Sequence, residues 1–343
     1  MSRPEYRIPG QIKTGKLSSS SGPGKTDFPE AKELFVEKLI CHDPRTKHLM
    51  ESEMALSVLP ATGAGAEITG VDISRRLSES EMTVIKNAFA EHGAIFFREQ
   101  NLTEAEHITF ARRFGEININ RFFAKHRDYP EIAMVSKEPD QVANIGGGWH
   151  TDHSYDQEPA MGSILIAREL PPSGGDTWFA NMYKAYETLP VDLKASIRDL
   201  RAIHSARHVF GSRDDMDMLK KTRGRIGNPE AADALHDSEH PVVISHPLSK
   251  KKALYVNPGF TIGIAGWSER DSESLLGKLY KHAIKEEHIT KYQWKPGSIA
   301  FWDNRATWHF AQNDYQGFRR IMHRITINGC PLESAFADTK KAS

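Results

Sequence analysis

The sequence predicts an α+β protein with a mainly β core, a jelly roll or barrel to which helices are added. Many short β-type runs follow one another, separated by turn residues. Helical patterns interrupt them, and the chain has no internal repeat of the length that builds solenoids. The runs, in order, are ALSVLPATGAGAEITGVDI, GAIFFR, EIAMVS, GSILIARE, PVVISHP, ALYVNPG, SIAFWD and RRIMHRITING.

Four segments have helical patterns. Ser78 with Glu81 fits a capping box for a helix that runs through Phe89. Thr103 begins a second helix, which we expect to end with Gly115 in the C′ position. Two later helical stretches complete the set, Tyr183–Leu200 and Arg270–Lys285.

Composition narrows the class of protein. The 343 residues carry 45 basic and 45 acidic side chains, so net charge gives no reason to expect nucleic acid or an anionic membrane as partner. No apolar run approaches the roughly 20 residues that span a bilayer, and the polar N-terminus lacks a signal-peptide core. With only Cys41 and Cys330, neither a disulfide scaffold nor a thiolate zinc cluster is available. We expect a cytoplasmic protein that acts on a small molecule.

We divide the chain into three parts. Residues 1–53 are an N-terminal extension, partly flexible because of a Ser/Gly/Pro-rich stretch, with a short helix near Glu30–Leu39. Residues 54–331 form one domain, and residues 332–343 are a C-terminal tail. Within the domain, the polar segment Gly211–Glu239 is either a solvated loop or a lid over a site.

The most informative motif is GGGWHTDHSY, which contains His150 and Asp152. On a strand, residues i and i+2 project to the same face, so an imidazole nitrogen and a carboxylate oxygen can reach one point. Two histidines and one carboxylate form the facial triad that holds non-haem Fe(II) and leaves coordination positions open. An isolated HxD pair has little specificity, and a second histidine is needed.

The residues leave the choice of that histidine open. His309 lies just beyond a strongly apolar strand, whereas His204 and His208 compete at helical i, i+4 spacing. Residue type alone adds five further candidates: His240, His246, His282, His288 and His323.

An independent clue is the strand-like run RRIMHRITIN. Arg320, Met322 and Arg324 share one face of such a strand. If that face points inward, each guanidinium needs an anion, because an unpaired buried charge costs several kcal/mol. The anions are either carboxylates on neighbouring strands or small anionic ligands that match the guanidinium fork.

These pieces occur together in one family. From about Met54 to Asn328, the chain resembles the TauD/TfdA (taurine / 2,4-dichlorophenoxyacetate dioxygenase) family of Fe(II)- and 2-oxoglutarate-dependent dioxygenases. The matching stretches are WHTDHSY, ELPPSGGDTWFANMYKAYETLP, HPLSKKKALYVNPGF and WDNRATWHFAQNDYQGFRRIMHR. The resemblance implies a double-stranded β-helix (jelly roll) with flanking and inserted helices, and an oxidoreductase that uses Fe(II), 2-oxoglutarate and O2.

The resemblance also implies roles for single residues. His150, Asp152 and His309 match the three metal ligands of the family. Arg320 matches the arginine that pairs with the C5 carboxylate of 2-oxoglutarate, and Thr177 matches the threonine that hydrogen-bonds the same group. Relatives commonly form dimers or tetramers, so we expect a homo-oligomer.

The substrate is a small organic acid by the same resemblance. Arg324 matches the second arginine of the motif, which holds the substrate's sulfonate or carboxylate, and Phe210 and Phe260 match apolar walls of the taurine pocket. The outcome implied is hydroxylation, with bond cleavage where the hydroxylated carbon carries a heteroatom.

Three other positions in that pocket depart from the taurine enzyme. Asn120 and Phe123 stand where it has histidine and tyrosine, and Gly146 replaces an asparagine. The departures remove polar contacts and add space or apolar surface, so we expect an acid other than taurine, larger or more apolar.

Two alternative functions use the same scaffold. One is a catalytically silent sensor that binds 2-oxoglutarate or a metal, and the other is a zinc-dependent hydrolase or isomerase of the cupin type. The intact triad, Thr177 and Arg320 argue against a sensor, which needs no such complete set.

Overall fold

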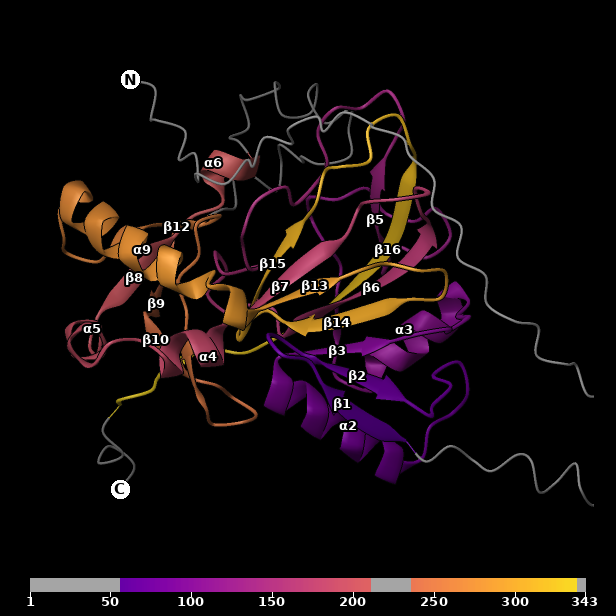
Figure 1. The fold of residues 1–343 in the computed structure, drawn as a ribbon, viewed down its shortest axis with the longest axis horizontal. Helices are drawn as coiled ribbons and strands as arrows, with labels where there is room; N and C mark the ends of the chain where they lie inside the picture. The colour runs from indigo at the N-terminus through magenta and orange to yellow at the C-terminus, as the bar shows by residue number, and fades with distance from the viewer. Residues whose placement is uncertain (1–55, 211–235, 338–343) are drawn as a thin grey trace, which may run out of the picture. The chain divides into compact units, whose positions relative to one another are not determined.

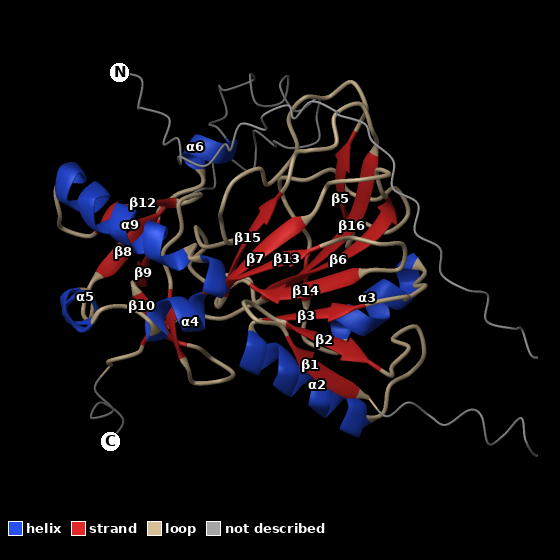
Figure 2. Ribbon diagram, viewed as in Figure 1, coloured by secondary structure: helices blue, strands red, loops and turns tan. Residues whose placement is uncertain are grey.

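A computed structural model describes residues 56–210 and 236–337, and Figures 1 and 2 show their arrangement. These residues form a sheet-rich α+β fold with few helices, as the sequence predicts. The helix expected near Glu30–Leu39 and residues 211–235 of the segment considered as a lid lie outside the described ranges. The end of that segment is regular structure, since Ser238 and Glu239 belong to a strand.

The largest sheet of the described ranges has eight strands. Its order is β1-β2-β3-β14-β6-β16-β4, with β5 also pairing β16, and all contacts are antiparallel except β2 with β3. The bounds are β1 Ser57–Pro60, β2 Ala66–Thr69, β3 Ala94–Phe97, β4 Ile117–Asn118, β5 Ala133–Lys137, β6 Gly162–Glu169, β14 Ile299–Asp303 and β16 Arg320–Ile327.

The two faces of this sheet bury different cores, as alternation of side chains along a strand requires. Ile95 and Phe97 face the helices α2 (Glu79–His92) and α3 (Glu104–Arg112), which cover one side of the sheet (Figure 2). Ala94 and Phe96 face the opposite way, into a second cluster with Trp302.

That second cluster lies between two sheets. The strands β13 (Ile289–Tyr292), β7 (Thr177–Asn181) and β15 (Thr307–Ala311) pair in this order and form the facing sheet. Phe179 of β7 packs against Phe96 and Trp302 of the large sheet, with ring centroids 5.4 and 5.7 Å apart. The space between the sheets is therefore where inward-facing side chains of β15 and β16 meet.

A third hydrophobic core includes buried residues of two further three-stranded sheets of the described chain, β11-β10-β17 and β12-β8-β9. Their strands are β8 Arg201–His204, β9 Ser238–Pro241, β10 Val243–Ser245, β11 Lys252–Leu254, β12 Thr261–Ile264 and β17 Glu333–Ser334. The accompanying helical segments are α4 Met182–Glu187, α5 Val191–Ser196, α6 Arg207–Phe210, α9 Glu269–Ala283 and the 3₁₀ turn η1 Glu286–His288.

The helix predictions are confirmed in type and corrected in detail. Ser78 and Thr103 each form a capping box, and Gly93 ends α2 in the left-handed conformation. Gly115 is not the C′ residue, because α3 already ends at Arg112 with a right-handed cap at residue 113. The helix expected over residues 183–200 is two short helices, because Pro190 lacks the N–H that a continuous helix needs.

The C-terminal segment differs from the tail that the sequence predicts. The segment expected as a tail after residue 331 begins with β17, which pairs with β10, and Phe336 packs against the third core.

Among the described helices, none has the length and apolar character that crossing a membrane requires.

Candidate metal centre

His150 and His309 meet across two chain segments that lie far apart in the sequence. They form an isolated antiparallel bridge, in which each backbone N–H donates to the other residue's carbonyl, at 3.1 and 2.8 Å. Their ring centroids lie 4.1 Å apart. The β15 strand carries His309 into the space between the sheets, where its ring packs against Trp302.

Asp152 completes the group, but through a turn rather than a strand. Only His150 makes a bridge contact, and residues 152–155 form a turn in which His153 has φ 60°. The expectation of an extended i, i+2 pair is therefore wrong in conformation, although the two side chains still converge. The Asp152 carboxylate oxygens lie 3.8 Å from His150 Nε2 and 3.8 Å from His309 Nε2.

The electrostatics of this group suit a divalent metal. Burial opposes ionisation of Asp152, but the Arg324 guanidinium and the two imidazoles outweigh it and lower the pKa of the carboxyl. Burial, together with the neighbouring His150 ring, lowers the pKa of His309 well below its ordinary value. His150 Nδ1 lies 2.8 Å from the Gly148 carbonyl, so Nδ1–H donates and the Nε2 lone pair is free. Two imidazoles and one carboxylate that converge on one point fit Fe(II).

The other candidate histidines do not join this group in the described structure. His204 and His240 pack against each other and Tyr255, and His246 pairs with buried Asp303 at 3.0 Å. His208 bonds the Gly259 carbonyl at 2.7 Å. The remaining two share a hydroxyl, since His282 and His288 both contact Thr188 Oγ1.

His323 belongs to a second set of donor groups, with Glu104 and His126. A protein cation already occupies this set. Arg168 Nε donates to His323 Nδ1 at 3.1 Å, and its Nη2 lies 3.5 Å from the Glu104 carboxylate. The guanidinium charge disfavours a metal ion there, so His150, Asp152 and His309 form the candidate centre.

Two glycines leave room around His150. Gly146 has φ +77°, and a Cβ there would lie 3.3 Å from His150 Cε1. A Cβ on Gly259 would lie 2.6 Å from the His150 Cβ. Gly146, where the sequence predicts added space, therefore lies directly beside a candidate metal ligand.

Arg320 of β16 is a buried cation with free donors. It is 4% exposed, and its Nε and Nη2 have no hydrogen-bond partner within the described structure. Burial lowers the pKa of the guanidinium. Trp294 lies beside it, 5.8 Å from Cζ, and donates its indole N–H to Thr177 Oγ1 at 2.9 Å. Trp294 therefore contacts both the guanidinium, which keeps free donors for an anion, and the Thr177 hydroxyl.

Arg324, two residues beyond Met322 on the same inner face, is paired differently. It is 5% exposed, its Nη1 donates to Asp152 Oδ2 at 3.1 Å, and its Nε has no partner in the described chain. The guanidinium also lies over the Phe123 ring, 4.3 Å from the centroid. Of the two anion sources that the sequence leaves open, a fixed carboxylate therefore serves Arg324, while one nitrogen remains for a ligand.

An aromatic cluster lies next to the metal centre. Phe260 approaches the His150 ring at 6.1 Å and packs against Tyr155 and Phe210. Phe210 stacks on Phe122 at 4.1 Å. The predicted pocket residues Phe210 and Phe260 are thus together, beside the centre.

Asn120 has a different local task. Its side-chain oxygen accepts hydrogen bonds from the backbone N–H groups of Phe122 and Phe123, at 2.9 and 3.0 Å. It therefore shapes the turn that presents both phenylalanines.

Phe122, Tyr155 and Trp294 are not among the site residues predicted from the sequence. Phe122 directly precedes Phe123 and follows Asn120, and both the Asx turn and the aromatic pair are signals in the sequence. Nothing in the sequence alone indicates that Trp294 reaches Thr177, because that contact links β7 to the segment after β13.

Comparison with known proteins decides the family. Residues 57–326 match the taurine catabolism dioxygenase TauD, TfdA family. The chain belongs to this family. The resemblance drawn from the motifs is therefore confirmed, and the chain is a 2-oxoglutarate-dependent dioxygenase, an oxidoreductase.

The dioxygenase is similar in sequence to two curated relatives and in structure to a third protein. It is 34% identical to an alpha-ketoglutarate-dependent sulfate ester dioxygenase from Pseudomonas putida, over 80% of this chain and 90% of that protein. It is 33% identical to an alkylsulfatase from Acinetobacter baylyi, over 83% of this chain and 88% of the other. A crystal structure of a taurine dioxygenase from Burkholderia xenovorans superposes with a TM-score of 0.68 at 34% identity, covering 82% of this chain and 93% of that one.

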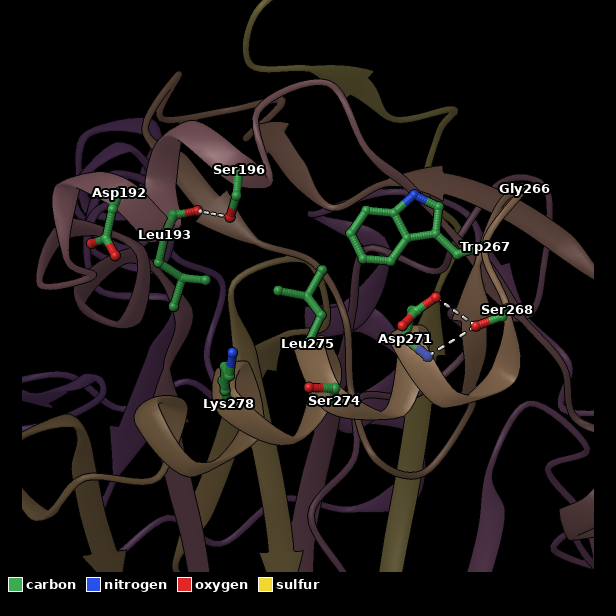
Figure 3. Close-up of a pocket in the computed structure, with 10 residues that line it drawn as sticks. All are labelled: Asp192, Leu193, Ser196, Gly266, Trp267, Ser268, Asp271, Ser274, Leu275 and Lys278. Atoms are coloured by element: carbon green, nitrogen blue, oxygen red, sulfur yellow. Dashed lines mark hydrogen bonds between the residues drawn. The ribbon is translucent and has the colours of Figure 1, made fainter.

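A surface hollow of the dioxygenase lies apart from these residues. A cavity of about 650 Å³ between α5 and the start of α9 is lined by Asp192, Trp267, Asp271 and Lys278 among others (Figure 3). Ser268, which also lines it, uses its hydroxyl to cap α9 through the Asp271 N–H. None of the three candidate metal ligands is among its lining residues.

Proposed function

We propose that this dioxygenase hydroxylates an aliphatic sulfate ester. The observation that carries the proposal is the placement of two buried guanidiniums on one inner strand face, next to a His/Asp/His group and an aromatic cluster. The names of the relatives from Pseudomonas putida and Acinetobacter baylyi support a sulfate ester rather than a carboxylic acid.

The first part of the proposal concerns the metal and the co-substrate. His150, Asp152 and His309 would hold Fe(II), and Arg320 with Thr177 would hold the far carboxylate of 2-oxoglutarate. The support is the converging donor set and the unpartnered Arg320 nitrogens. When bound, Fe(II) with 2-oxoglutarate and O2 supplies the oxidising power that inserts one oxygen atom into a C–H bond.

The second part concerns the substrate. The free Nε edge of Arg324 would receive the sulfate group, while its Nη1 stays on Asp152. The alkyl chain would lie against Phe210 and Phe260, whose rings offer apolar surface beside His150. Anchoring the anion at one end and the chain at the other places the carbon next to the ester oxygen near the metal ligands.

The bonds that change follow from that placement. Hydroxylation of the carbon that bears the ester oxygen gives a hemiacetal sulfate, R–CH(OH)–OSO3⁻. Its hydroxyl proton leaves, the C–O bond to sulfate breaks, and the products are an aldehyde and hydrogen sulfate. One oxygen atom of O2 enters the substrate and the other enters succinate, which forms with CO2 from 2-oxoglutarate.

The decisive experiment is a product assay with the Fe(II)-loaded full-length protein. We expect hexyl sulfate to give succinate, hexanal and sulfate in equal amounts, and taurine to give far less. A succinate yield that depends on no sulfate ester, but on an aryloxyacetate or a sulfonate, would contradict the substrate class and leave the dioxygenase assignment intact.

The apolar wall at Phe260 gives a second test of the pocket. Phe260→Ala removes apolar surface next to His150, so we expect KM for hexyl sulfate to rise about tenfold, at the lower end of the roughly 1–3 kcal/mol that one methylene in an apolar pocket is worth. KM for 2-oxoglutarate should not change. Equal effects on both would place Phe260 outside the substrate pocket.

The proposal also covers the more detailed expectations from the sequence: the type of fold, the alternative functions, the oligomeric state and the location. The two packed sheets support a double-stranded β-helix as the fold of the domain. The family match favours neither a silent sensor nor a zinc-dependent hydrolase. The homo-oligomer and the cytoplasmic location stay predictions, which sedimentation and cell fractionation test.

A further inference from the structure

We propose that Lys137 is a positioning residue for the co-substrate, because it holds the loop that forms one wall of the Arg320 site. The inference rests on the proposed function, in which Arg320 and Thr177 hold the far carboxylate of 2-oxoglutarate. Nothing in the sequence motifs points to Lys137, which follows a short apolar strand and precedes an acidic residue.

The placement of Lys137 is unusual for a lysine. It ends β5 directly opposite Arg320 in the register with β16, and it is 2% exposed. Lysine is almost never buried without specific partners. Its ammonium donates to Asn313 Oδ1 and Gln316 Oε1, at 3.0 Å each, and lies 4.3 Å from the centroid of the Tyr315 ring.

All three of these partners belong to the loop 312–319, which joins β15 to β16. The same loop therefore connects the strand that carries His309 with the strand that carries Arg320. Two side chains of the loop also bind a neighbouring segment, because the amide groups of Asn313 and Gln316 donate to the Val142 carbonyl at 2.9 and 3.4 Å.

The loop holds the turn before Thr177 as well. Asp314 accepts a hydrogen bond from the Gly175 N–H at 2.7 Å, and the Gln312 N–H donates to the Asp176 carbonyl at 2.8 Å. Thr177 follows directly at the start of β7. Fixing the loop therefore fixes the backbone that presents the threonine.

The loop also forms one wall of the Arg320 site. The Tyr315 ring centroid lies 6.0 Å from the Arg320 Cζ. A Cβ on Gly175, which has φ +73°, would lie 3.3 Å from both Arg320 Nε and Tyr315 Cδ1. Tyr315, Gly175 and Arg320 are thus in tight contact, so a shift of the loop changes the space around the guanidinium.

A lysine suits this task for a chemical reason. An ammonium offers three donors in a compact group, so it satisfies two amide oxygens and an aromatic face together. A methionine of similar length fills the space but donates nothing, which leaves two amide oxygens without a donor and loosens the loop. The consequence is a less well-placed Arg320 and Thr177, with the metal ligands unaffected.

The test measures binding rather than turnover, with the Mn(II)-loaded full-length protein and isothermal titration. The probes are 2-oxoglutarate and 2-oxopentanoate, which has the same chain length but lacks the far carboxylate. The variants are Lys137→Met and the double variant Asn313→Ala/Gln316→Ala, which removes the two acceptors from an exposed loop. The matched control is Lys251→Met, since Lys251 Nζ also lies over a tyrosine ring, 5.4 Å from Tyr183.

We expect both the lysine variant and the loop variant to raise the Kd for 2-oxoglutarate about tenfold, the loss that follows when a hydrogen bond to a charged group is weakened. The Kd values for 2-oxopentanoate and for Mn(II) should stay at the wild-type values, and Lys251→Met should change none of the three. Rescue by Lys137→Arg, which keeps the charge and the donors, should be partial.

Other outcomes overturn the inference. Unchanged binding of 2-oxoglutarate in the loop variant would do so, including in the case that Lys137→Met does not fold. A uniform loss for both oxo acids and Mn(II) would show that Lys137 supports the fold in general. Failure of the wild-type protein to bind 2-oxoglutarate would contradict the proposed function itself, before any variant is compared.

Discussion

Asp152 and Arg324 form a buried pair, with Arg324 Nη1 donating to Asp152 Oδ2 at 3.1 Å. The carboxylate is at the same time 3.8 Å from the Nε2 atoms of both histidines of the candidate metal centre. A guanidinium that we propose to receive the substrate is therefore hydrogen-bonded to a candidate metal ligand. An anion bound at the free Nε of Arg324 would therefore be linked to the candidate metal centre through the Arg324–Asp152 hydrogen bond.

This pair separates the roles of the two arginines. Arg324→Ala should raise KM for the sulfate ester about 100-fold, within the 2–5 kcal/mol that truncation of a buried charge pair costs. It should also weaken the binding of Fe(II), because Asp152 loses the partner that orients it, while the Kd for 2-oxoglutarate changes little.

Arg320→Ala should do the reverse for the two organic ligands. It should weaken the binding of 2-oxoglutarate and leave KM for the ester near wild type, because Arg320 lies beside Trp294, which bonds Thr177, rather than beside Asp152. Steady-state kinetics with each ligand varied in turn checks both variants. Equal effects of the two changes on the two ligands would show that the roles are assigned wrongly.

Removal of the proposed metal ligand should have an optical consequence. Anaerobic addition of Fe(II) and 2-oxoglutarate should give a weak visible charge-transfer band in the wild type, which chelation with EDTA abolishes. Asp152→Ala should lack the band and lose about 3–5 kcal/mol of stability, since Arg324 is left as an unpaired buried charge. Asp152→Asn is the matched variant, because it keeps an acceptor for Arg324; a normal band in Asp152→Ala would exclude the aspartate as a ligand.

Gly146 offers a test of space beside the centre. Gly146→Ala places a residue with a Cβ at φ +77°, which costs about 1–2 kcal/mol, and brings that Cβ to 3.3 Å from His150 Cε1. We expect a lower melting temperature and weaker Fe(II) binding. Gly266→Ala is the control, because Gly266 has φ +76° and nothing within 4 Å of its Cβ position. If both variants bind Fe(II) equally well, Gly146 has only a conformational role.

The pH dependence of stability should report on His323. Burial, and then the Arg168 charge, lower the pKa of His323 to about 4. The unfolded chain takes up a proton near the ordinary value while the folded protein does not, so stability decreases as pH falls from about 6.5 to about 4. His323→Gln should reduce the proton uptake on unfolding by about one proton in this range. Melting temperatures between pH 7 and 4.5 measure it, and an unchanged slope would contradict the assignment.

Local chemistry explains why much of the fold was predictable. Ser78 and Thr103 begin helices because their hydroxyls and the glutamates three residues later satisfy the first N–H groups. Alternation along β16 places Arg320 and Arg324 inward, because successive side chains of a strand face opposite sides. These signals lie within a few residues of each other, so they can be read without the fold.

Contacts between distant segments decided the rest. The residues alone left eight histidines open as the third ligand, and only the bridge between residues 150 and 309 brings one of them to Asp152. The contacts of Lys137 and Trp294 depend in the same way on which strands and loops become neighbours. Strand pairing and register decide which remote residues come into contact. Such a contact leaves no local pattern in the sequence around either residue.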